Sequence, residues 1–221
     1  MEKMPYQEQL DSTPVGSLRV ATAVMESDWR QQVPVLTGSM VTLRELELGD
    51  APSLLAMLSS EEVARFISPP PTTVEGLERF ITWARAQRQQ GEYVCFAVVP
   101  HGTSIAIGLF QVRRLEANFS SAEWGFAIGS AYWGTGVFAD GGQLTIDFAM
   151  TTLGTHRLEA RAAVANGRGN GALRKMGAVQ EGILRRSFLR GGQYLDQVLW
   201  SILASDWREA KRTGIPPTQL H

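Results

Sequence analysis

Apolar positions in the first third of the chain recur at the spacings of a strand and two helices. Residues 41–46 begin with an apolar side chain at every second position, which predicts a strand. Asp50 is a good N-cap for a short helix that carries Leu54, Leu55 and Leu58. Residues 69–71 are all proline and predict an extended break, because proline disfavours helix in the residue before it.

After the prolines, the pattern predicts a longer helix followed by consecutive strands. The helix runs from a Thr73 cap to about residue 90, with Gly91 as its stop. Its apolar residues fall on one stripe, formed by Leu77, Phe80, Ile81 and Ala84. Apolar-rich runs then predict strands over 93–99, 105–115 and 122–128.

The second half of the chain alternates between helical and strand patterns. A helix is predicted over 136–153, a strand over 157–164, and a glycine-punctuated helix that ends at Gly177. Two strands follow on either side of a turn at 191–192, and Ser205 caps a last helix. The order β-α-α-β-β-β-α-β-α-β-β predicts an α/β protein, with a mixed sheet and helices packed on it.

Domain boundaries follow from the same pattern. Residues 1–38 show no sustained period of 2 or 3.6 and contain three prolines. They are predicted to be an extension, ordered only where Trp29 and its neighbours fill a groove. Residues 39–213 carry the regular pattern of one domain, and residues 214–221 are a tail. The length of 221 residues agrees with one domain and an appendage.

Composition and charge exclude several classes of protein. Cys95 is the only cysteine, so no internal disulfide can form. The chain has no secretory signal pattern and no run of 18 apolar residues, so we expect a cytoplasmic protein without a membrane partner. A net charge of −1 argues against direct binding of nucleic acid. Residues 156–221 nevertheless carry 11 Lys and Arg against 5 Asp and Glu. This excess fits either an anionic ligand or solvated arginine faces.

Two segments carry the candidate chemistry. The segment 132–139, YWGTGVFA, lies between a predicted strand and a helix start, where glycines let the backbone approach a ligand. The unpaired N–H groups of a helix's first turn suit a phosphate. The second segment is 166–177, NGRGNGALRKMG. The first segment has neither the Lys-Ser/Thr of a P-loop nor the third glycine of a dinucleotide fingerprint.

Together with the strand AEWGF at 122–126, these segments resemble the GNAT superfamily of acyl-CoA-dependent N-acetyltransferases, and more narrowly its RimJ/RimL branch. The resemblance covers about residues 39–207. It implies a mixed, mostly antiparallel sheet of about seven strands with helices on both faces. It also implies that the fourth and fifth predicted strands, 122–128 and 157–164, splay apart. The implied cosubstrate is acetyl-CoA.

The resemblance also implies where the coenzyme binds. Trp133 and Gly134 belong to the turn, and the backbone amides from Thr135 to Ala139 would cradle the pyrophosphate. The residues concerned are Thr135, Gly136, Val137, Phe138 and Ala139. The pantetheine arm would pair with the strand edge at Phe126, Ala127 and Ile128. Asn166 would bond that arm, with Asn170 or Lys175 near the adenosine end.

Several positions depart from the family pattern, among them Thr135, Phe138 and Leu173. Thr135 stands where a basic residue is common, and Phe138 stands where the family has Gly or Ala. The Phe138 ring either crowds the phosphates or points into the core. Leu173 occupies the position of the usual tyrosine acid, so we assign no side-chain acid there. A thiol with a pKa near 8.5 is a tolerable leaving group without one.

Two glutamates are candidate bases. Glu123 shares its strand face with Gly125 and Ala127, which leaves room for a ligand and favours a catalytic or amine-binding role. Glu159 shares its face with two arginines, so an ion-paired surface residue is the simpler interpretation. By resemblance, Tyr194 and Asp196 can line the acceptor site, and stabilisation of a turn explains them equally well.

The predicted function is N-acetyl transfer by direct attack of a primary amine on the thioester. At pH 7, neutralising an α-amine costs roughly 1.2 kcal/mol and a lysine amine roughly 4.6 kcal/mol. One plausible base therefore favours an α-amine, on a protein N-terminus or a small molecule. The alternative is an acyl-CoA-binding sensor or scaffold without turnover. The three histidines lack metal-ligand spacing, so no metal is predicted, and a homodimer is expected by family analogy alone.

Overall fold

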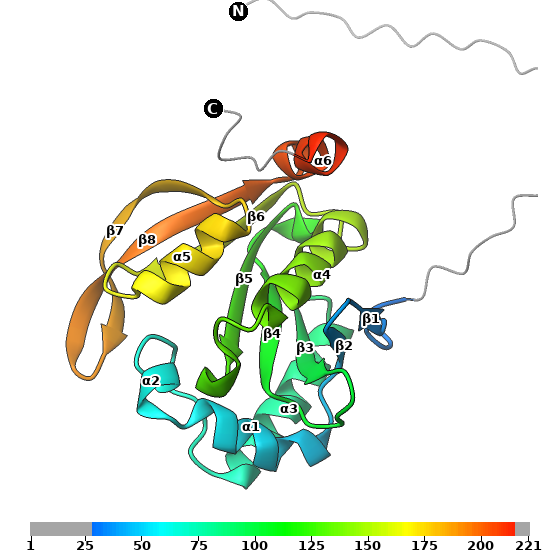
Figure 1. Ribbon diagram of the computed structural model, residues 1–221, viewed down its shortest axis with the longest axis vertical. Helices are drawn as coiled ribbons and strands as arrows, with labels where there is room; N and C mark the ends of the chain where they lie inside the picture. Colours follow the sequence, from blue (N-terminus) through cyan, green and yellow to red (C-terminus); the bar gives the residue numbers. More distant parts are fainter. Residues whose placement is uncertain (1–27, 215–221) are drawn as a thin grey trace, which may run out of the picture.

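The computed structural model describes residues 28–214, which form a single eight-stranded sheet in the order β1-β2-β3-β4-β5-β6-β8-β7 (Figure 1). All neighbouring strands are antiparallel except β5 and β6. The strands are β1 (Leu36–Thr37), β2 (Val41–Glu45), β3 (Tyr93–Pro100), β4 (Gly108–Arg114), β5 (Ser121–Ile128), β6 (Arg157–Ala163), β7 (Val179–Arg190) and β8 (Gln193–Leu203). The predicted mixed, mostly antiparallel α/β fold is confirmed.

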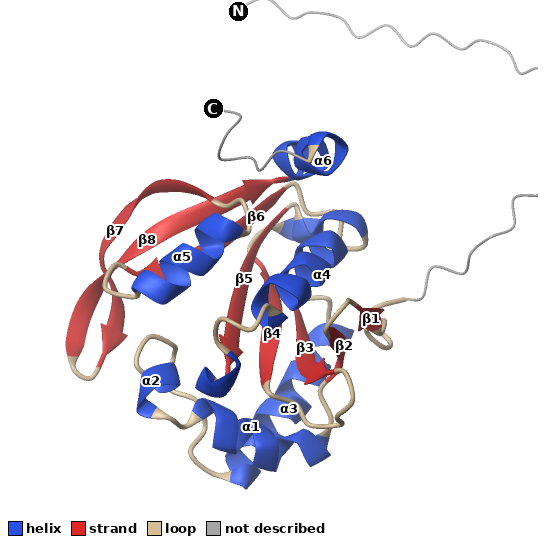
Figure 2. Cartoon of the chain, viewed as in Figure 1, coloured by secondary structure: helices blue, strands red, loops and turns tan. Residues whose placement is uncertain are grey.

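Helices cover both faces of this sheet (Figure 2). They are α1 (Ala51–Leu58), α2 (Glu61–Ala64), α3 (Val74–Gln89), α4 (Val137–Thr151), α5 (Gly167–Lys175) and α6 (Ala204–Thr213). Strand β3 shows how alternation divides the core. Phe96 packs with Phe148 of α4 on one face, and Cys95 belongs to the cluster of α1 and α3 on the other.

The pairing between β5 and β6 is short. Its register joins Ser121 to Arg157, Ala122 to Leu158 and Glu123 to Glu159, and no pair follows along these described strands. Strand β5 continues to Ile128 against β4 alone, while β6 continues to Ala163 against β8 alone. The sheet therefore opens between β5 and β6 beyond Glu123, at the two strands that were predicted to splay.

Residues 28–38 of the predicted extension pack on the domain. Trp29 is buried against Phe119, with ring centroids 5.5 Å apart at 88°. The Arg88 guanidinium donates to the backbone carbonyls of Trp29 and Arg30. Strand β1 extends the sheet by one strand, which accounts for eight strands where about seven were expected. The division at residue 39 stays a prediction, and residues 1–27 and 215–221 lie outside the described chain.

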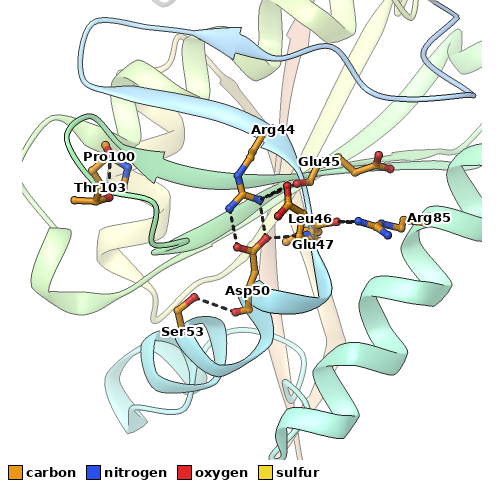
Figure 3. A network of polar contacts seen from close by, with 9 residues as sticks. All are labelled: Arg44, Glu45, Leu46, Glu47, Asp50, Ser53, Arg85, Pro100 and Thr103. Carbon is orange, nitrogen blue, oxygen red and sulfur yellow. Dashed lines mark hydrogen bonds and ion pairs between the residues drawn. The ribbon is translucent and has the colours of Figure 1, made fainter.

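Helix starts confirm the predicted cap positions at Thr73 and Asp50 and contradict the one at Ser205. Thr73 accepts a hydrogen bond from the N–H of Gly76 at 3.0 Å, as a cap should. Asp50 makes no cap bond; its carboxylate instead accepts two hydrogen bonds from the Arg44 guanidinium, each 2.7 Å long (Figure 3). Ser205 lies inside α6, whose N-cap is Leu203. Asp50 is thus the N-cap of α1, and only the partner of its carboxylate, Arg44 of β2, was not predicted.

Candidate active site

A cleft of about 490 Å³ occupies the opening between β5 and β6. It brings together four of the predicted site residues, Glu123, Phe126, Ala127 and Asn166. Its apolar wall includes Phe66 and prolines 69–71 from the α2–α3 connection, Phe80 of α3 and Phe188 of β7. Its polar lining includes Gln111 and Arg113 of β4, Arg161 of β6 and Gln197 of β8.

The glycine turn lies between the end of β5 and α4. Gly134 and Gly136 have φ values of 78° and 96°, which favour glycine over other residues. In the described chain, the N–H groups from Gly134 to Ala139 have no protein acceptor, whereas the N–H of Asp140 donates to the Gly136 carbonyl. A row of free N–H groups at the positive end of a 15-residue helix has the geometry and charge that suit an anion.

The Phe138 side chain points into the core. Its ring lies 4.6 Å from the Phe126 ring and 5.7 Å from the Phe110 ring, between centroids. Phe138 is not among the residues that line the cleft. Of the two orientations considered for this residue, the inward one is therefore observed, and only its backbone faces the turn.

A network of hydrogen bonds holds the start of α4 against the β1–β2 turn. The Asp140 carboxylate accepts hydrogen bonds from the N–H groups of Ser39, Met40 and Val41, at 2.8 to 3.0 Å. Burial opposes ionisation of Asp140, but the N–H groups outweigh it and lower the pKa of that carboxyl. A Cβ on Gly38 would lie 2.3 Å from an Asp140 oxygen, so only glycine fits there. The first turn of α4 is thus fixed from outside the helix.

Arg168 supplies a cation beside the glycine turn. Its guanidinium stacks on the Trp133 ring, 4.3 Å from the centroid, and Trp133 donates to the Ile128 carbonyl at 2.9 Å. The sequence showed Thr135 where a basic residue is usual, and the structure brings this cation from α5 instead. Sequence reasoning missed Arg168, because its proximity to Trp133 depends on how α5 packs beside the turn.

The predicted coenzyme residues at the start of α5 and within it differ in how many of their polar side-chain atoms already have protein partners. The Asn166 oxygen caps the helix by accepting from the N–H of Gly169 at 2.9 Å, so its NH₂ group is free of that bond. Both polar atoms of the Asn170 side chain have protein partners, at Ala163 and Trp200. Lys175 lies exposed in the last turn, roughly 13 Å along the axis from Asn166.

Six charged residues form a ladder of alternating sign across the closed end of the cleft. In spatial order they are Arg113, Glu123, Arg161, Glu159, Arg157 and Glu181. Glu123 pairs closely with Arg113 and contacts Arg161 at 3.6 Å. Glu159 accepts from Arg157 at 2.9 Å and does not line the cleft. The ladder spans β4 to β7 at the point where only three residue pairs join β5 to β6.

Ionisation of Glu181 links this ladder to acid stability. A hydrogen bond from Arg157 lowers the pKa of Glu181 to about 2, against burial, with help from Ser201. A carboxyl whose pKa falls on folding stabilises the fold above its unfolded pKa, near 4.5, and this stabilisation disappears as pH drops toward 2. In Glu181→Gln, the melting temperature is therefore expected to fall less between pH 4.5 and 2 than it does in the wild-type protein. An unchanged slope in thermal unfolding would contradict this linkage.

Comparisons with known proteins identify the family. Residues 40–179 match the acetyltransferase (GNAT) domain family. This chain belongs to the GNAT acetyltransferase family. The p20 protein of Bacillus licheniformis, an uncharacterized N-acetyltransferase, is 27% identical over 168 residues, which cover 76% of this chain and 94% of that protein. The predicted acetyltransferase class is confirmed, and the alternative of a non-catalytic binding protein has less support.

Two solved GNAT structures show the same fold. Mycobacterium smegmatis RimJ, in complex with CoA-disulfide, has a TM-score of 0.74 at 19% identity and covers 85% of this chain and 96% of its own. The ribosomal-protein-S5-alanine acetyltransferase of Vibrio fischeri has a TM-score of 0.71 at 20% identity, with coverages of 79% and 98%. The GNAT fold implies that the acyl donor is an acyl-CoA.

The residues present fit such a donor. Free N–H groups, the α4 dipole and Arg168 converge on one turn, which suits a pyrophosphate. The β6-facing edge of β5 beyond Glu123 has no strand partner among the described residues, which leaves its peptide groups open to a pantetheine arm. Of the predicted coenzyme residues, Asn170 fits least well, because its amide is already bonded to protein atoms.

The residues that the β7–β8 hairpin contributes to the lining of the cleft do not include Tyr194 and Asp196. Tyr194 is 63% exposed, and the Asp196 carboxylate accepts from the N–H of Arg186 at 2.7 Å. Asp196 thus stabilises an irregular part of the hairpin, where Arg186 has a positive φ of 49°. Phe188 and Gln197 line the cleft instead. The pairing of β7 with β8 has two register shifts. Strict alternation along these strands therefore does not indicate which residues face the cleft.

Two further side chains that the sequence analysis discussed are buried. Leu173 is buried and lines the cleft, so no acid group stands there. Burial raises the pKa of the Cys95 thiol to about 12, which agrees with the predicted core thiol.

Within residues 28–214, no group of three or more His, Cys, Asp or Glu side chains is placed to hold a metal. None of the helices in that part is long and apolar enough to span a membrane.

Proposed function

We propose that this GNAT protein transfers an acetyl group from acetyl-CoA to a primary amine, by direct attack in a ternary complex. The observation that carries the proposal is the cleft between β5 and β6, with Glu123 at the point where pairing ends. The acceptor is the α-amine of a protein N-terminus or a small-molecule amine. The folds of RimJ and of the S5-alanine acetyltransferase support a place in the RimJ/RimL-like branch.

In this proposal, the glycine turn and the open edge of β5 hold the coenzyme. The N–H groups from Thr135 to Ala139 bind the pyrophosphate, and Arg168 adds a positive charge beside it. The edge of β5 from Phe126 to Ile128 pairs with the pantetheine arm, and the NH₂ group of Asn166 donates to it. When bound, acetyl-CoA supplies an acetyl thioester that is already activated for transfer.

Glu123 is the proposed proton acceptor, acting through a water molecule. It lines the cleft, and Gly125 and Ala127 on the same strand face leave space beside it. A strand N–H near Ile128 would donate to the oxygen that gains charge during the attack. No side-chain acid is required at Leu173, because a thiol with a pKa near 8.5 leaves readily as a thiolate.

Glu123→Gln is expected to lower kcat by about 10² to 10⁴, the usual contribution of a general base. The readout is acceptor-dependent release of free thiol from acetyl-CoA, with KM measured for both substrates. Glu159→Gln is the matched control, because it removes a charge from the same ladder outside the cleft, and a much smaller loss is expected. Equal losses in the two variants would assign Glu123 to the ladder and not to proton transfer.

A further inference from the structure

Within residues 28–214, one guanidinium in the cleft has no close acceptor. Arg161 contacts Glu123 at 3.6 Å and Glu159 at 3.8 Å, both longer than the 2.7 to 2.9 Å of a charge-assisted hydrogen bond. Arg157, two residues earlier on β6, makes hydrogen bonds of 2.9 and 2.8 Å to Glu159 and Glu181. Arg161 lines the cleft and its side chain is 37% exposed, so its N–H groups are available to an anion.

Glu123 and Arg161 form a pair of opposite charges at the closed end of this cleft. Both line it, and they lie on the two strands that part here, Glu123 in the last pair of β5 and β6 and Arg161 two residues past that pair on β6. An α-amino acid carries its amine and its carboxylate on one carbon, so the two groups can meet two side chains that are this close. We propose that the acceptor is a free α-amino acid, with its carboxylate on Arg161 and its amine beside Glu123, at the water through which Glu123 accepts the proton.

The remaining walls indicate the side chain of this amino acid. Phe66, prolines 69–71, Phe80 and Phe188 line the same cleft as the charged pair and give it apolar walls, which favour an apolar side chain. Arg190 of the β7–β8 hairpin donates to the Ala64 carbonyl of α2 at 2.7 Å, which ties the hairpin to the helix across from it. This contact favours a small acceptor over an extended chain.

The inference rests on the proposed acetyl transfer and specifies its acceptor. The amine nitrogen forms a bond to the acetyl carbon, and the carbon–sulfur bond breaks. The bound ammonium loses one proton before the attack and another as the amide forms. One of these neutralises the departing thiolate, and the other passes to solvent. The products are an N-acetyl amino acid, CoA and one proton.

The test compares three acceptors that share one side chain: L-leucine, L-leucine amide and a peptide that begins with leucine. Free-thiol release should give L-leucine a kcat/KM at least tenfold above that of the amide. Intrinsic reactivity predicts the reverse, because a neighbouring carboxylate favours the protonated amine and leaves less of it neutral at pH 7. A preference for the free acid therefore reports recognition of the carboxylate.

Arg161→Gln should reduce this preference to within about twofold, mainly through a higher KM for L-leucine, and Arg161→Lys should retain part of it. Arg208→Gln, on exposed α6 and outside the cleft, should keep the full preference. If the amide or the peptide reacts as well as the acid in the wild-type protein, the inference is wrong while acetyl transfer stands. If no amine releases thiol, both the inference and the proposed function are overturned.

Discussion

Gly136→Val is expected to lower kcat/KM for acetyl-CoA at least 100-fold. Gly136 has φ of 96°, and a β-branched residue held there stores about 1–3 kcal/mol of strain. A Cβ at this position would also lie 3.0 Å from the Met40 sulfur, so the side chain has little room. Relief of either conflict rotates the peptide groups that begin α4. Those groups carry the N–H donors proposed to bind the pyrophosphate.

The measurement is the KM for acetyl-CoA together with the Kd of CoA by calorimetry. A 100-fold loss corresponds to about 2.7 kcal/mol of binding free energy. Gly102→Val is the matched control, because Gly102 has a similar φ of 80° in the β3–β4 turn, with no atom within 4 Å of its Cβ position. It should lower the melting temperature through the same strain and leave the Kd unchanged. Wild-type affinity in Gly136→Val would show that the turn does not bind the pyrophosphate.

The sequence predicted the parts of this site that lie within one element. The glycine turn, the start of α4 near residue 136 and the strand face of Glu123 all follow from local spacing and turn chemistry. The splayed strands came from the resemblance to GNAT proteins, and the register confirms that β5 and β6 separate beyond Glu123. Local patterns succeed here because backbone geometry alone determines which groups a strand or helix end presents.

Contacts between elements were not predictable in this way. Alternation along β5 gave Glu123 two small neighbours, but its actual partners are Arg113 on β4 and Arg161 on β6. Which charges meet depends on which strands pair and in what register, and the alternation along one strand does not show either. The orientation of Phe138 has the same origin, because its neighbours Phe110 and Phe126 belong to other elements.

The structure of residues 28–38 was not visible in the hydrophobic pattern for a different reason. The segment contributes one turn and the two-residue β1, which is too short for any period to be visible. Its attachment depends on single large side chains, above all Trp29 and Val33, both buried in the core shared with α4. Trp29 also brings its carbonyl within 3.4 Å of the buried Arg88 guanidinium, whose Nε donates to Glu45. The segment therefore completes one side of the domain.

Trp29→Ala is expected to lower the free energy of unfolding by about 3–5 kcal/mol, as for other buried aromatic side chains cut to alanine. The Trp29 ring is 7% exposed and packs edge-on against Phe119, so its loss leaves a cavity that the neighbours fill only in part. Urea unfolding followed by circular dichroism gives the value. Trp83→Ala is the control, because Trp83 is 48% exposed on α3, and about 1 kcal/mol is expected. Equal effects would mean that the domain begins near residue 39, as the sequence pattern suggested, and that residues 28–38 add little to its stability.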